Sequence, residues 1–167
     1  MATYVNDLRL KEIATGDESG TWGTSTNTNL ELIGEALSYG TEAVFDSDAN
    51  KTATIADGST DPFRALYVKV TGSATLSTTR VLTIAPNTVS KLYIIENATT
   101  GSQIITIKQG SGATVNIANG AVKMVYLDGG GSGAVVTDAL VDLDLTGTTT
   151  IASVDINGGA VDGVTLG

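Results

Sequence analysis

The sequence contains no cysteine and no histidine. Without cysteine, the chain has no disulfide, no thiolate metal ligand and no thiol nucleophile. Without histidine, it lacks the commonest general base and metal ligand, so a Ser-His-Asp triad is impossible. We therefore expect that the protein is not an enzyme and that it holds neither a cofactor nor a resident metal.

Basic residues and aromatic residues are also scarce. The chain has 9 Lys and Arg against 18 Asp and Glu, a net charge of -9, and such a chain repels phosphate backbones and anionic membrane surfaces. No stretch approaches the roughly 20 apolar residues that span a bilayer, and the N-terminus has no apolar signal core. We expect no nucleic-acid partner, no membrane insertion, and synthesis in a cytoplasm without export by a recognisable signal.

The rest of the amino-acid composition favours strands and turns. Aromatic residues make up 5% and charged residues 16% of the 167 residues, and Thr, Ser, Gly, Asn and Asp dominate the rest. This length suits one ordinary domain with appendages. Composition divides the chain into three zones, residues 1–41, 42–140 and 141–167.

The first zone contains the only Trp, in the polar run "GDESGTWGTSTNTN". This run has no hydrophobic periodicity and cannot build a core. Trp22, with Gly20 and Gly23 close by, is therefore predicted to meet a partner surface. The alternative is that the Trp22 ring folds back over its own helix.

A short helix is predicted to follow this run. Thr28 and Glu31 have the spacing of a capping box, and Gly40 offers a left-handed stop. Leu30, Ile33 and Leu37 recur at helical spacing between them. We predict a helix over residues 29–39, which is too short to be stable without packing on a neighbour.

The second zone alternates apolar and polar residues with period two. In "FRALYVKV", Leu66, Val68 and Val70 share one face and Tyr67 and Lys69 the other. Similar segments follow at intervals of about 8 to 12 residues, separated by turn clusters such as "APNT" and "QGSG". The pattern predicts a mainly β protein whose central domain is an antiparallel, jelly-roll-like β-sandwich.

The third zone carries a short repeat, "LDLTG", "VDING" and "VTLG". A single ribbon of this kind cannot bury its own apolar face. We therefore expect a homotrimer in which equivalent ribbons form the start of a β shaft; the alternative is a disordered acidic tail. The predicted shaft core consists of Leu143, Leu145, Val154, Ile156, Val164 and Leu166. The repeat stops at Gly167, which suggests that more chain follows or that a partner caps it.

Two groups of acidic residues could form a chemical site, a calcium loop and pairs of catalytic carboxylates, but each also fits an ordinary role in a turn. A possible calcium loop has oxygen-bearing residues at alternating positions and an Asp at its end: Asp46, Asp48, Asn50, Thr52 and Asp57. Its sixth position is Lys instead of Gly, so a solvated turn is the stronger interpretation. Paired carboxylates, Asp57 with Asp61 and Asp142 with Asp144, have the residue type of glycosidase acids, but Asp in turns more often caps the backbone.

The run "LRLKEIATGDESGTWGTSTNTNLELIGEAL" resembles the N-terminal region of tail fibre proteins of tailed bacteriophages, particularly short-tailed ones. The segments "ATVNIANGAVKMVYLDGGGSG" and "VDINGGAVDGVTLG" are similar to later parts of these fibres. The resemblance implies a trimeric virion protein that is anchored to tail or adaptor proteins and supports adhesion to a host-surface glycan through distal parts. The implied anchoring residues are Gly16, Asp17, Trp22, Gly23, Asn27, Asn29 and Leu30.

Three other functions stay open. A carbohydrate-binding module would need exposed aromatic platforms; Tyr67, Tyr93 and Tyr126 are too few for this and fall within predicted strands. A polysaccharide depolymerase would need paired acids in a groove between subunits. A head decoration or head fibre protein belongs to the same structural class as a tail fibre and fits the sequence as well.

Overall fold

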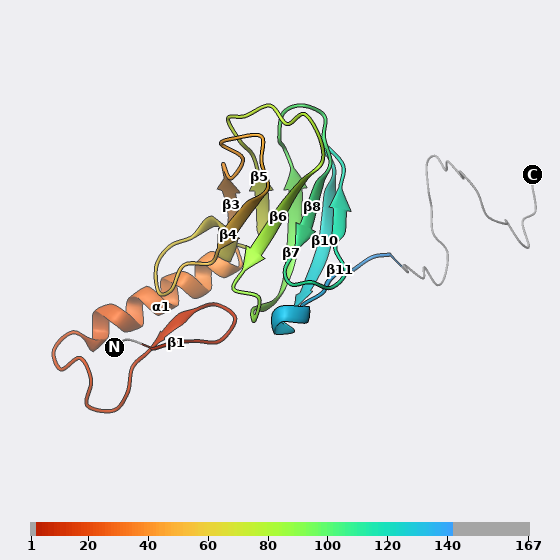
Figure 1. The fold of residues 1–167 in the computed structure, drawn as a ribbon. Coiled ribbons are helices and arrows are strands. Elements are labelled where there is room, and N and C mark those ends of the chain that lie inside the picture. The colour runs from red at the N-terminus through yellow and green to blue at the C-terminus, as the bar shows by residue number, and fades with distance from the viewer. Residues whose placement is uncertain (1–2, 142–167) are drawn as a thin grey trace, which may run out of the picture.

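The computed structural model describes residues 3–141 (Figure 1). This part contains eleven strands in three sheets and one α-helix, so the prediction of a mainly β protein is confirmed. No helix within it is long and apolar enough to cross a membrane. The six predicted shaft-core residues and the pair Asp142 and Asp144 lie outside the described residues, so the shaft stays a prediction.

The N-terminal zone forms a small hairpin followed by the helix. Strands β1 (Thr3–Val5) and β2 (Leu10–Glu12) pair antiparallel, and α1 spans Trp22–Ala36. The predicted helix bounds, 29–39, are therefore wrong at both ends. Thr28 lies inside the helix and caps nothing, and Gly40 lies in a strand.

Tertiary contacts explain the early start of α1. Its first two turns are rich in Thr, Ser, Asn and Gly, which are weak helix formers. Two side chains in this stretch and just after it, Ser25 and Asn29, hydrogen-bond to Lys11 of β2. These contacts to a distant strand stabilise turns that local propensity does not favour.

The remaining strands form two larger sheets. Their bounds are β3 (Tyr39–Glu42), β4 (Lys51–Thr54), β5 (Tyr67–Val70), β6 (Arg80–Ala85), β7 (Ser90–Asn97), β8 (Ile105–Lys108), β9 (Val115–Ile117), β10 (Val122–Asp128) and β11 (Val136–Asp138). Two single turns of 3-10 helix, η1 (Pro62–Arg64) and η2 (Gly131–Gly133), lie in the loops. The five-stranded sheet has the order β11-β10-β7-β5-β3, and the four-stranded sheet has the order β4-β6-β8-β9.

The chain alternates between these two sheets from β3 to β8. As a result, β3 pairs parallel with β5, β5 with β7, β4 with β6, and β6 with β8. The expectation of antiparallel pairing is therefore wrong for these four pairs and correct for β8–β9, β7–β10 and β10–β11. A jelly-roll, which is an antiparallel architecture, is not confirmed.

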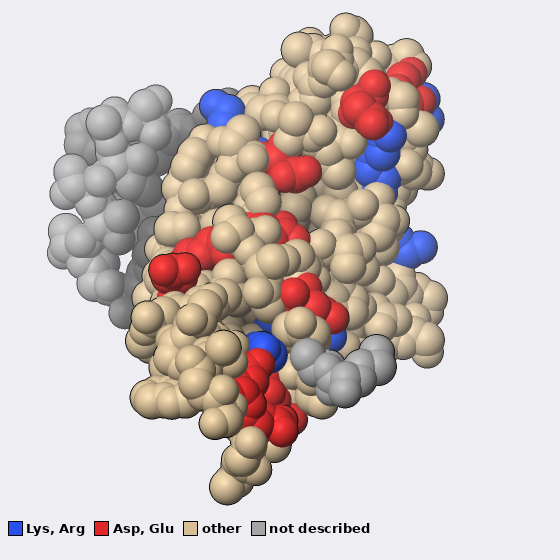
Figure 2. Space-filling model, turned by 90° about the vertical axis from the view of Figure 1, so that its left-hand side faces the viewer, with Lys and Arg blue, Asp and Glu red and all other residues tan. Residues whose placement is uncertain are grey.

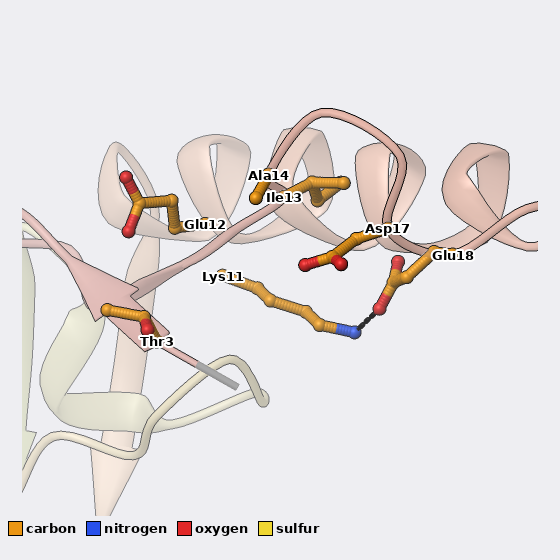
Figure 3. Close-up of a pocket in the computed structure, with 7 residues that line it drawn as sticks. All are labelled: Thr3, Lys11, Glu12, Ile13, Ala14, Asp17 and Glu18. Atoms are coloured by element: carbon orange, nitrogen blue, oxygen red, sulfur yellow. Dashed lines mark hydrogen bonds and ion pairs between the residues drawn. The ribbon is translucent and has the colours of Figure 1, made fainter. Parts of the chain in front are cut away.

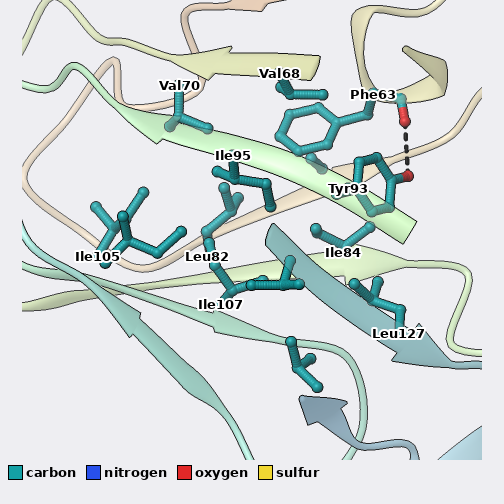
Figure 4. Packing of buried hydrophobic residues seen from close by; sticks show 14 of the residues in the cluster. Phe63, Val68, Val70, Leu82, Ile84, Tyr93, Ile95, Ile105, Ile107 and Leu127 are labelled. Carbon is teal, nitrogen blue, oxygen red and sulfur yellow. Dashed lines mark hydrogen bonds between the residues drawn. The ribbon is translucent and has the colours of Figure 1, made fainter. Parts of the chain in front are cut away.

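The two larger sheets enclose one hydrophobic core (Figure 4). The predicted alternation is confirmed where it can be followed along β5: Val68 and Val70 are buried, and Tyr67 and Lys69 are not. Buried side chains from both sheets belong to the same cluster, among them Leu82, Ile84, Tyr93, Ile95, Ile105, Ile107, Val125 and Leu127. Burial of such side chains is worth about 1.5–3 kcal/mol each and is the main source of stability.

Candidate docking surface

One face of α1 is fixed to the rest of the chain. The Asn29 amide accepts a hydrogen bond from the Lys11 backbone N–H (3.0 Å) and donates one to the Lys11 carbonyl oxygen (2.8 Å), so it extends β2 as a neighbouring strand would. Leu32 and Ala36 are buried on the same side of the helix. This face positions α1 and is unavailable to a partner.

A buried ion pair fixes the C-terminal end of α1 to the two-sheet domain. The Glu35 carboxylate accepts hydrogen bonds from the Arg64 guanidinium (3.2 Å) and from the Asp61 backbone N–H (2.8 Å). Arg64 is fully buried and also donates to the carbonyl oxygens of Ala56 (2.6 Å) and Ser59 (2.9 Å). These hydrogen bonds hold the C-terminal end of α1 against the segment around η1.

The loop before α1 closes over a polar cavity of about 230 Å³ (Figure 3). Lys11 and Glu18 form an ion pair across it, and Asp17 and Thr3 lie at its border. The Lys11 ammonium, with the Ser25 hydroxyl, holds the pKa of the Glu18 carboxyl below its usual value. These contacts order the loop that leads to Trp22.

A second face of α1 is apolar and exposed. The exposed fractions are 61% for Trp22, 61% for Leu30, 40% for Ile33 and 77% for Leu37. At 100° per residue Trp22, Leu30 and Ile33 fall within an arc of about 80°, next to the buried face, and Leu37 follows as the C-cap residue. We call this set of four the α1 stripe. An exposed apolar stripe on an otherwise fixed helix is typical of a docking surface.

The structure does not bring the seven predicted anchoring residues together on one surface. Trp22 and Leu30 belong to the α1 stripe, and Gly23 lies in the same first turn. Gly16, with a left-handed φ of 91°, and Asp17 lie in the exposed loop. Asn27 is exposed away from the stripe, and Asn29 faces inward to β2.

Sequence reasoning missed Ile33 and Leu37 as surface residues. Their helical spacing with Leu30 was the available signal, because it predicts the apolar side of an amphipathic helix that packs on a neighbour. The side that actually packs, with Leu32 and Ala36, is the less hydrophobic one. The alternative for Trp22, a ring folded over its own helix, does not fit its large exposed fraction.

The residues of the possible calcium loop do not converge on one point. Asp46 pairs with Lys51, Asp48 pairs with Arg80 (2.7 Å), and Asp57 pairs with Arg9 (2.6 Å). The Asn50 side-chain oxygen accepts from the Val81 backbone N–H. Residues 3–141 contain no group of three or more acidic side chains arranged to hold a metal ion. The solvated-turn interpretation is the one that the geometry favours.

The carboxyls of Asp57 and Asp61 also have separate structural roles. The two Asp61 oxygens accept from the backbone N–H groups of Phe63 (2.8 Å) and Ala56 (2.7 Å). Asp61 lines a second hollow of about 300 Å³ with Glu42, whose pKa is raised by burial and by the nearby Asp61 charge. Because the Asp61 oxygens are already occupied, this pair does not offer two free carboxyls for acid–base chemistry.

No family model, no curated protein and no solved structure matches the chain. The class that the coordinates define is a mainly β protein with two large mixed sheets around one core. The α1 stripe is the docking candidate that this fold presents at its N-terminal side.

Proposed function

We propose that this protein is a virion structural protein of a tailed bacteriophage, a tail fibre that attaches to the tail through its N-terminal zone. In this proposal it acts as a homotrimer in the virion, docks on tail or adaptor proteins, and supports adhesion to the host surface through its distal part. The resemblance of the Trp-Gly segment to phage tail fibres is the starting point.

The observation that carries the proposal is the α1 stripe. It contains Trp22 and Leu30, two residues implied by the resemblance, on a helix whose other face is held by Asn29 and Glu35. A stripe held in this way loses little conformational entropy when it docks, and large aromatic and aliphatic side chains supply most of the energy at interfaces.

The polar cavity supports the same interpretation. The Lys11–Glu18 ion pair holds the loop that precedes Trp22. The indole ring of Trp22 is therefore attached to an ordered segment before it docks. The surface seen from the helix side carries its charged side chains in small separate groups on a mainly uncharged background (Figure 2).

The test is the location and incorporation of the protein in virions. Gold-labelled antibodies against the chain should decorate the tails of particles purified from the lysed host. Trp22→Ala and Leu30→Ser should reduce incorporation at least tenfold, and Asn27→Ala, exposed on α1 outside the stripe, should leave it unchanged.

Three outcomes would contradict the proposal. Label on heads would favour a head decoration or head fibre protein. Unlabelled particles would exclude a virion role. Full incorporation of Trp22→Ala and Leu30→Ser would show that the α1 stripe is not the anchor.

A carbohydrate-binding module is the second candidate, because the fold adds an aromatic residue that the sequence interpretation did not include. Tyr39, expected at the end of the helix, lies in β3 with its ring 5.5 Å from that of Tyr67. Tyr93, in contrast, is fully buried and cannot contact a glycan. Binding on a glycan array that is lost in Tyr67→Ala would favour this second candidate.

A further inference from the structure

The outer faces of the two larger sheets differ in chemistry. The outward side chains of the four-stranded sheet are mostly Thr, with one Val, one Asn and one Lys: Thr52, Thr54, Val81, Thr83, Thr106, Lys108 and Asn116. The five-stranded sheet has seven apolar or aromatic side chains on its outer side, Tyr39, Tyr67, Leu92, Ile94, Val122, Met124 and Tyr126, and six polar or charged ones, Thr41, Lys69, Ser90, Glu96, Asp128 and Thr137. We call the surface formed by the apolar and aromatic set the apolar sheet face. A soluble sheet normally has one polar side, and the four-stranded sheet alone follows that rule.

Strand register makes the apolar sheet face continuous. Tyr39 lies opposite Tyr67, Tyr67 opposite Ile94, and Ile94 opposite Met124, so one row crosses four strands. In the neighbouring row Leu92 lies opposite Tyr126. Tyr39, Leu92, Val122 and Tyr126 are each 40% to 58% exposed. A contiguous exposed patch of this kind marks an interaction surface.

The charges on the apolar sheet face nearly cancel. Lys69 and Glu96 form an ion pair on it (3.2 Å). At its border the Asp128 carboxylate accepts from the backbone N–H groups of Gly130 and Val135 (2.9 Å each) and is turned to its own loop. On a chain with a net charge of -9, this is a surface where two copies can meet without strong repulsion. A second copy also presents a cation for Glu96 and an anion for Lys69.

The polar groups of the face are already paired within the chain. The Tyr67 hydroxyl donates to Glu96 (2.9 Å), the Thr41 hydroxyl donates to the Tyr39 oxygen (2.9 Å), and the Tyr126 and Ser90 hydroxyls share a hydrogen bond (2.8 Å). A sugar needs free donors and acceptors for its hydroxyl groups, whereas a dry protein contact needs polar groups that are satisfied. Tyr and Met are also enriched, and charged side chains depleted, at the centres of protein interfaces.

From these observations we propose that copies of this chain associate through the apolar sheet face. The partner is a second copy, and the contact lies in the two-sheet domain and uses none of the four residues of the α1 stripe. The inference shares with the proposed function only the expectation that copies associate. A cyclic assembly repeats this contact around its axis, as in most soluble homo-oligomers.

The absence of cysteine allows a direct test on the full chain. Leu92→Cys places a single thiol on the central strand β7 at an exposed position, and Thr83→Cys places one on the outer face of the other sheet. With a short bismaleimide at low micromolar protein, Leu92→Cys should yield mainly covalent dimers, at least tenfold more than Thr83→Cys. Met124→Cys repeats the test at a second position, and circular dichroism checks that all variants are folded.

Light scattering of the unmodified chain completes the test. A mass of more than one chain together with crosslinking confined to the apolar sheet face supports the inference. A monomer overturns it, and so does an oligomer in which Leu92→Cys and Thr83→Cys crosslink equally or not at all. Glycan binding by a monomer that is lost in Tyr67→Ala would assign the face to a sugar instead. Immunolabelling of tails is independent of these results, so failure here is distinguishable from failure of the proposed function.

Discussion

The Glu35–Arg64 pair is predicted to hold α1 on the two-sheet domain. Arg64 is fully buried, and the side chain of Glu35 is 17% exposed. Removing one partner of a buried ion pair leaves the other charge uncompensated, which typically costs about 3–5 kcal/mol. In Glu35→Ala the guanidinium keeps two carbonyl acceptors, those of Ala56 and Ser59, so we expect the lower end of that range.

The expected loss in free energy of unfolding is therefore about 3 kcal/mol, a large part of the roughly 5–15 kcal/mol that stabilises a domain. Glu31→Ala is the matched control, because Glu31 is exposed on the same helix, and it should change stability by less than about 0.5 kcal/mol. Combining Glu35→Ala with Arg64→Met removes both charges and should recover part of the loss.

The assay is urea denaturation followed by far-ultraviolet circular dichroism and by tryptophan fluorescence. Because Trp22 is the only Trp and lies on α1, fluorescence follows the helix, and circular dichroism follows the sheets as well. A Glu35→Ala variant within about 0.5 kcal/mol of the unmodified protein would refute the reasoning. Equal losses in Glu35→Ala and Glu31→Ala would refute it too.

Three further predictions concern the two-sheet domain. The fully buried Asn97 amide donates to the carbonyl oxygens of Gln103 and Ile117 (3.0 Å each). Asn97→Ala should therefore lower the free energy of unfolding, measured by heat or urea, by about 3 kcal/mol. Asn116→Ala, on the exposed face, is the control and should leave it unchanged. Burial, with the nearby Arg64 charge, lowers the pKa of Lys91 to about 8, and a depressed lysine pKa means that the unfolded chain binds more protons at higher pH. Stability should thus rise between about pH 8 and pH 10, and Lys91→Met should flatten that rise in a pH series of urea midpoints; a slope identical to that of the unmodified protein would contradict this. The Arg80 guanidinium and the Ser77 hydroxyl hold the pKa of Asp48 well below its usual value, so stability should fall as the pH drops below about 4, and Asp48→Asn should be less sensitive to acid in the same series.

Much of the fold could be predicted, because buried side chains alternate with more exposed ones along most of the length of the core strands. Val68 and Val70 are core residues in the sequence pattern and in the structure. Strand pairing could not be predicted in the same way. A run such as "RVLTIA" shows which side chains face the core, but nothing in it shows that the next strand, β7, crosses to the other sheet. Period-two patterning is the same for antiparallel and parallel neighbours, so pairing depends on the path of the loops.

The candidate site was predicted in part. An isolated Trp between small polar residues indicated a surface role, and Trp22 is exposed. The sequence did not show which side of α1 packs against the rest of the chain. The apolar spacing of Leu30, Ile33 and Leu37 predicted a helix that packs on a neighbour. Long-range hydrogen bonds of Asn29 and Glu35 hold a different side of α1 against the chain and leave those three residues exposed.

The sequence by itself determined the mainly β class, the alternation of buried and exposed side chains, and the placement of the single Trp on a surface segment. These features depend on local properties: residue composition, period and turn chemistry. Only the tertiary structure decided the parallel strand pairs, the early start of α1, and the joining of Tyr39 with Tyr67, Ile94 and Met124 in one row. These features depend on contacts between residues far apart in the chain, such as Glu35 with Arg64, which no local pattern encodes.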